Sequence, residues 1–105
     1  MKLTVAERFA TLGVLPEQGD FLTLKVLRQL REALSFDEDE MKFYSFKEKG
    51  DRLYWDESKD THTKDFEFGD KQTELVVSAL QKLDSQKQLT EEHFSIYEKF
   101  IGGGV

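Results

Sequence analysis

The chain has 105 residues and a hydrophobic content of 38%, including nine Phe, three Tyr and one Trp, which is too high for a disordered chain. Because it has no cysteine, disulfides, thiol nucleophiles and zinc–thiolate sites are excluded. The formal net charge of −6 disfavours direct binding to nucleic acid, since a phosphate backbone repels an acidic protein.

Length and hydropathy predict a single domain over residues 1–105, with a Gly-rich tail at residues 102–105. No stretch reaches the roughly 20 apolar residues that a membrane span needs. Glu7 and Arg8 interrupt the first apolar run, which is too short for a secretion signal. We therefore expect a cytoplasmic protein without membrane association.

A short first helix is predicted from the sequence that follows Thr4. Thr4 and Glu7 have the spacing of a capping box, in which each side chain hydrogen-bonds to the backbone amide of the other residue. Gly13 tolerates the left-handed conformation that commonly ends a helix, so we expect the helix to end there.

The clearest helix pattern runs from Phe21 to Leu34, where Asp20 can serve as the N-cap. Its apolar residues recur at helical spacing and should form one core-facing stripe. The stripe comprises Leu22, Val26, Leu27, Leu30, Ala33 and Leu34.

Lys25, Arg28 and Arg31 recur every three residues on the same predicted helix and form a narrow basic ridge. Such a ridge can hold an anion or an acidic partner. The alternative is a solvated helix face whose charges pair with Glu32 or with acids elsewhere.

An acidic run follows, and Ser35 and Glu38 fit a second capping box that starts a third helix ending near Phe43. Asp37, Glu38, Asp39 and Glu40 then occupy its first turn, where the helix dipole favours negative charge. Successive helical residues point about 100° apart, so these acids cannot converge on one metal ion. We predict no metal site, and a partner-binding role for this acidic surface.

Alternating residues from Tyr44 predict a β-hairpin whose type II′ turn begins at Gly50. A two-residue loop pairs Phe46 with Trp55 and Glu48 with Leu53, whereas a three-residue loop would pair Phe46 with Tyr54. We prefer the first register because it collects the apolar side chains on one face. It leaves Tyr54 on the open face of the hairpin, as a further candidate for partner contact.

Residues 61–68 alternate again, with Phe66 and Phe68 inward, and predict a third strand beside the hairpin. Asp70 can cap a helix that continues to about Asp84, and Thr90 can cap a last helix that Gly102 ends. The predicted class is α+β, with helices flanking a small three-stranded antiparallel sheet in the order α-α-α-β-β-β-α-α.

The sequence contains no recognisable catalytic motif. There is no G-x-S-x-G, and the two histidines, His62 and His93, lack a recognisable set of partners. The three glycines after Ile101 have no Walker lysine and no following helix to cradle a phosphate. We therefore predict a protein that is not an enzyme and holds no cofactor.

Two resemblances concern the chain as a whole. Three helices followed by a hairpin resemble the end of a winged helix-turn-helix domain, although the acidic start of the third helix would repel DNA. The stretches ERFATLGVLPEQGDFLTLKVLRQLREALSF and LTEEHFSIYEKF resemble small uncharacterised proteins encoded by bacteriophages and prophages. That resemblance brings no known activity, and it implies binding to a host or viral protein, in the host cytoplasm if the chain is phage-encoded.

The leading hypothesis is thus a non-enzymatic protein-binding module that binds or inhibits a host or viral protein through its acidic surface and hairpin. One alternative is a structural or assembly component that works as a homo-oligomer. Another is a protein that captures a small ligand, such as a nucleotide, between the hairpin and the helices.

Overall fold

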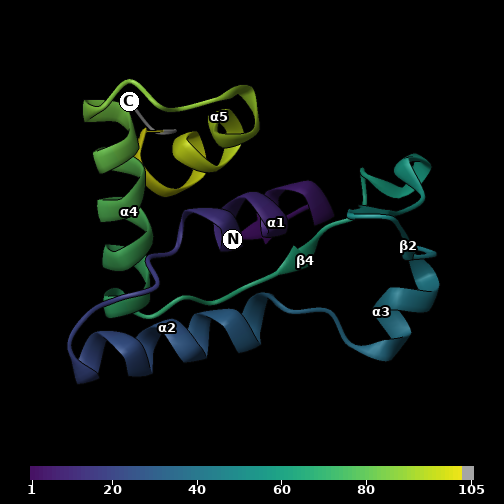
Figure 1. Ribbon diagram of the computed structural model, residues 1–105, viewed down its shortest axis with the longest axis horizontal. Helices are drawn as coiled ribbons and strands as arrows, with labels where there is room; N and C mark the ends of the chain where they lie inside the picture. The colour runs from purple at the N-terminus through teal and green to yellow at the C-terminus, as the bar shows by residue number, and fades with distance from the viewer. Residues whose placement is uncertain (103–105) are drawn as a thin grey trace.

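The computed structural model describes residues 1–102 and confirms the α+β class. Helices α1, α2, α4 and α5 gather on one side, whereas α3 and the hairpin stand on the other (Figure 1). In chain order the elements are β1 (Lys2–Leu3), α1 (Val5–Val14), α2 (Phe21–Leu34), α3 (Glu38–Phe43), β2 (Lys47–Lys49), β3 (Arg52–Tyr54), the 3₁₀ turn η1 (Glu57–Lys59), β4 (Lys64–Asp65), α4 (Asp70–Ser85), α5 (Glu91–Tyr97) and the π-helical turn η2 (Glu98–Gly102).

The main core lies between α1, α2, α4 and α5, where apolar stripes at helical spacing face one another. None of the helices within residues 1–102 is long and apolar enough to cross a membrane. The buried residues of this core are Ala10, Leu15, Leu27, Leu30, Val76, Leu80 and Ile96.

The capping box at the start of α1 is confirmed. The Thr4 hydroxyl accepts a hydrogen bond from the Glu7 amide at 3.2 Å, and the Glu7 carboxylate accepts one from the Thr4 amide at 2.9 Å. The predicted end at Gly13 is wrong, because α1 continues to Val14 and the extended backbone of Leu15 ends it. Gly13 therefore lies inside the last turn.

Helix α2 begins as predicted, since the Asp20 carboxylate accepts a hydrogen bond from the Thr23 amide at 2.8 Å. Its buried stripe is narrower than predicted. Leu22 is 71% exposed and Ala33 is also exposed, so both predictions of burial are wrong. The reason is that α2 lies at the edge of the helix group, where only one narrow side meets α1 and α4 (Figure 1).

Helix α4 starts one residue earlier than predicted. Gly69 is its N-cap, and the Gln72 side chain accepts a hydrogen bond from the Gly69 amide at 2.9 Å. Asp70, predicted to be the cap, is the first helical residue instead, where its charge still suits the helix dipole.

The last helix has Thr90 as its N-cap, as predicted. The Thr90 amide donates a hydrogen bond to Nδ1 of His93 at 2.9 Å, so this histidine takes the place that Glu or Gln has in a common capping box. The helical path then continues through η2 to Gly102, and residues 103–105 of the predicted Gly-rich tail lie outside the described part of the chain.

The hairpin of β2 and β3 has the preferred register, with Glu48 opposite Leu53 and Lys47 opposite Tyr54. Gly50 has φ of +65°, and Asp51 is not among the residues with positive φ. Both facts agree with the predicted type II′ turn, which needs a positive φ at its first central residue only.

The predicted three-stranded sheet is wrong, because β4 does not join the hairpin. It pairs antiparallel with β1 instead, with Lys2 opposite Asp65. The N-terminal ammonium also donates to the Phe66 carbonyl at 2.8 Å and forms an ion pair with Asp65 at 3.0 Å. Phe66 does face inward, but it packs in a second small core with Leu3 and Leu34 rather than behind the hairpin.

Two glycine substitutions test these turns. Gly50→Ala should lower the free energy of unfolding by about 1 kcal/mol, because an L-residue resists a positive φ. Gly13→Ala should raise it by about 0.5–1 kcal/mol, since an added Cβ there has no atom within 4 Å and the position is helical. Urea unfolding measures both changes in free energy. Changes of the same sign would contradict the positive φ at Gly50 or the helical conformation at Gly13.

Candidate binding surface

The most constrained group beside the hairpin is the guanidinium of Arg8, on α1. It is 1% exposed and its Nε donates to the Leu34 carbonyl at 3.3 Å, while a second nitrogen donates to the Ser35 carbonyl. Its charge pairs with the Glu40 carboxylate and lies 3.7 Å from the ring centroid of Phe36. Arg8 therefore ties the end of α2, the following turn and the start of α3 to α1.

Glu40 is held by this contact on the inner side of α3. It also lies 3.7 Å from the Lys64 ammonium and accepts a hydrogen bond from the Asp37 amide at 3.3 Å. Burial raises the pKa of Glu40, but the hydrogen bonds from Arg8 and Asp37 and the charges of Arg8 and Lys64 outweigh it, so the pKa lies below its ordinary value.

The four predicted partner-binding acids thus have different environments. Asp37 is the true N-cap of α3 and accepts from the Glu40 amide at 2.7 Å, so the capping box predicted at Ser35 is wrong by two residues. Within residues 1–102, Glu38 and Asp39 are exposed and have no ion pair or side-chain hydrogen bond. Only these two are free to meet a partner with their full charge.

A cluster of aromatic rings joins the hairpin to the helices. Phe36, on the turn after α2, lies 5.1 Å from Phe9 of α1 and 4.9 Å from Phe46, measured between ring centroids. Trp55 lies 5.4 Å from Phe9, and its indole nitrogen donates to Asp60 at 2.7 Å. Edge-to-face and tilted ring pairs of this kind stabilise a small core that has few aliphatic residues.

An open pocket of about 460 Å³ lies beside this cluster, between α1, the turn after α2, α3 and the hairpin. Met41 and Leu53 form part of its lining and are 48% and 39% exposed, so its apolar surface reaches solvent. The lining residues are Phe9, Leu12, Ser35, Phe36, Met41, Phe46, Glu48 and Leu53.

Further exposed apolar side chains lie on the same part of the molecule. Tyr54 is 48% exposed on the other face of the hairpin, as the register implies, and Phe43 is 43% exposed at the end of α3. A second hollow, of about 360 Å³, lies between Phe43, Asp39 and Lys64. Apolar surface and unpaired acids therefore lie side by side around α3.

Sequence patterns singled out the acids and Tyr54, and one alternative placed a ligand between the hairpin and the helices, but Met41 was not assigned to the lining of a pocket there. Met41 was the available signal, as an apolar residue directly between the charged Glu40 and Lys42. Arg8 also had a signal, because Val5, Arg8 and Leu12 share helical spacing, which places Arg8 on the inner face of α1.

The basic ridge lies away from the pocket, on the outer side of α2. Lys25, Arg28 and Arg31 are all exposed and line a shallow groove of about 610 Å³. The Arg31 guanidinium donates to the Pro16 carbonyl at 3.1 Å, and within residues 1–102 none of the three has an ion-pair partner within 4.0 Å. The ridge and the acidic turn are thus not neutralised by each other within one chain.

The two histidines do not form a joint site. His62 packs its ring at 5.0 Å from Phe43, whereas His93 caps α5. Over residues 1–102 no group of three or more His, Asp or Glu side chains is placed to hold a metal ion.

Comparison with known proteins adds no further constraint, since no family model, no curated protein and no solved structure matches this chain. The phage resemblance therefore stays a prediction.

Acid sensitivity follows from two carboxylates, the buried Glu7 and the half-buried Glu40. The Glu7 carboxylate lies 2.7 Å from the Lys99 ammonium. Burial raises the pKa of Glu7, but hydrogen bonds from Lys99, Thr4 and Ser95 outweigh burial, so the pKa lies below its ordinary value. The pKa of Glu40 is lowered in the same way. Because a lowered pKa in the folded state favours folding above the ordinary value near 4.5, stability should fall as pH drops through that value and below.

The variants Glu7→Gln and Glu40→Gln should each flatten this pH dependence of the unfolding free energy between pH 5 and 3. Glu17→Gln, at an exposed loop position, is the matched control and should keep the wild-type slope. Urea unfolding at several pH values measures it, and wild-type slopes in Glu7→Gln and Glu40→Gln would show that the pairs do not stabilise the fold.

Proposed function

We propose that this protein is a non-enzymatic binding module that holds an apolar side chain of a partner protein in the pocket between α1, α3 and the hairpin. The partner is a host or viral protein, as the resemblance to small phage-encoded proteins implies. The single observation that carries the proposal is the 460 Å³ apolar pocket with the exposed side chains of Met41 and Leu53 in its lining.

The pocket has the properties of a site that takes an inserted side chain. Its volume falls in the range of about 300–1,000 Å³ found for binding pockets. Its lining is mainly aromatic and aliphatic, and hot spots of protein interfaces are commonly such fully desolvated pockets. The exposed Phe43 at the end of α3 would extend the contact beyond the pocket, whereas Tyr54 faces the other side of the hairpin.

Charge indicates the kind of segment that fits. Glu48 is the acidic residue in the lining of the pocket. A segment with Lys or Arg next to an apolar residue would complement the Glu48 carboxylate, and the net charge of −6 would speed its approach. Glu48 also disfavours a nucleotide in the pocket, since its carboxylate would repel the phosphates.

Site-specific photocrosslinking tests the proposal. A photoreactive phenylalanine analogue at Leu53 should give a defined adduct with one partner in bacterial cells, whereas the same analogue at Gln81, exposed on α4, should not. Adding Met41→Lys should reduce the Leu53 adduct at least tenfold, because it places a charge in the apolar lining of the pocket.

Met41 is 48% exposed, so this substitution leaves the fold intact, which circular dichroism can verify. Equal adducts from the two positions, or a Leu53 adduct that Met41→Lys does not weaken, would overturn the proposed site. Absence of any adduct at Leu53 would also overturn it.

A further inference from the structure

The outer face of α2 is a helix face without a partner in this chain. Phe21, Lys25, Arg28 and Glu32 follow one another at spacings of four, three and four residues, so they form one stripe opposite the buried Leu27, Leu30 and Leu34. Phe21 is 81% exposed, the highest value among the exposed large hydrophobic residues of the described chain. The stripe carries two positive charges and one negative charge, whereas Arg31 points toward the body of the protein and donates to the Pro16 carbonyl.

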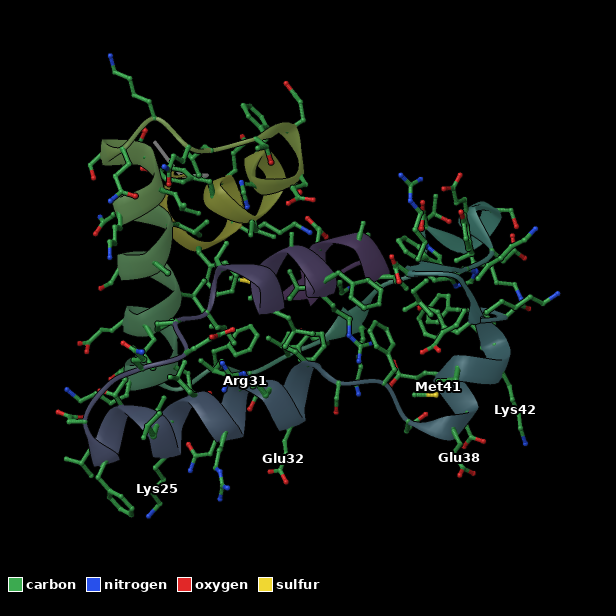
Figure 2. The ribbon with its side chains drawn as sticks, viewed as in Figure 1. Lys25, Arg31, Glu32, Glu38, Met41 and Lys42 are labelled. Atoms are coloured by element: carbon green, nitrogen blue, oxygen red, sulfur yellow. The ribbon has the colours of Figure 1, made fainter. Side chains whose placement is uncertain are left out.

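The outer side of α3 has the opposite charge and lies along the same edge of the molecule. Figure 2 shows Lys25 and Glu32 on α2 and Glu38 on α3 projecting away from the body on this edge, with Lys42 one turn beyond Glu38. Glu38 is negative there and Lys42 is positive, and Asp37 and Asp39 add two further negative charges at the start of α3. One edge therefore has a basic half and an acidic half.

We propose that a second copy of this chain docks on this edge and forms a two-fold symmetric dimer. A two-fold axis between the two halves sets α2 of each copy against α3 of the other, so that the basic half meets the acidic half twice. A parallel arrangement would oppose like charges, so the charges also determine the orientation. The partner's Lys25 and Arg28 then supply the counter-charges that Glu38 and Asp39 lack within the chain.

The size of the edge indicates a weak, salt-sensitive dimer. The longest dimension of the protein is 34 Å and runs along this edge (Figure 1). A strip of that length and one helix diameter wide covers roughly 400 Å² of each copy, below the approximately 800 Å² per partner of a standard stable interface. Exposed charges dominate the contact, so added salt should weaken it.

This contact goes beyond the proposed function, because it uses the outer side of α3 and leaves the pocket free. In Figure 2 Met41, which lines the pocket, lies higher on α3 than Glu38, away from this edge. The Leu53 crosslink and the dimer can therefore fail independently of each other.

A charge exchange between variants tests the dimer by sedimentation velocity, at protein concentrations up to about 1 mM in 25 mM and 500 mM NaCl. The wild type should form a dimer in low salt that dissociates in high salt. Lys25→Glu/Arg28→Glu and Glu38→Lys/Asp39→Lys should each be monomeric alone. An equal mixture should form a heterodimer, because both of its contacts again join opposite charges.

Lys82→Glu/Lys87→Glu, which makes the same charge change on α4 and the turn after it, is the matched control and should dimerise like the wild type. Glu38→Gln/Asp39→Asn removes the charges without placing cations at the start of a helix, and it should also be monomeric. This variant shows that loss of the dimer does not result from unfolding of α3. A wild type that is monomeric at 1 mM in low salt overturns the proposal. So does a dimer that either charge reversal leaves intact.

Discussion

The buried guanidinium of Arg8 is the constraint on which the arrangement of this protein depends. A buried charge is tolerated only when hydrogen bonds and a counter-ion compensate for lost hydration. Here the compensation comes from two carbonyls at the end of α2 and from Glu40 on α3. Three segments must therefore meet at one point of α1, and the turn between α2 and α3 has little freedom to move.

As a consequence, α3 and the hairpin are held in place by their contacts with the rest of the protein. A helix of six residues and strands of three are too short to be stable alone. Arg8 fixes α3, and the rings of Phe9, Phe36, Phe46 and Trp55 fix the hairpin against α1. The pocket lies beside these two attachments, between α1, α3 and the hairpin, while the main helices carry a separate aliphatic core.

Local signals in the sequence predicted local structure, and long-range contacts were missed. The caps at Thr4 and Asp20 and the hairpin register around Gly50 follow from residues within a few positions of each other. The pairing of Lys2 with Asp65 spans most of the chain and involves strands of two residues, so no periodicity reveals it. The acids of α3 were recognisable as a group. Which of them forms an ion pair depends on Arg8, and an arginine is normally expected at the surface.

The central claim is tested most directly by a double-mutant cycle between Arg8 and Glu40, measured as free energies of unfolding in urea. Arg8→Met alone should cost about 3–5 kcal/mol, because it leaves Glu40 partly buried without its main counter-charge. Arg8→Met/Glu40→Met should recover most of that loss, giving a coupling energy above about 1.5 kcal/mol. A coupling energy below about 0.5 kcal/mol, which is typical of an exposed ion pair, would contradict the account.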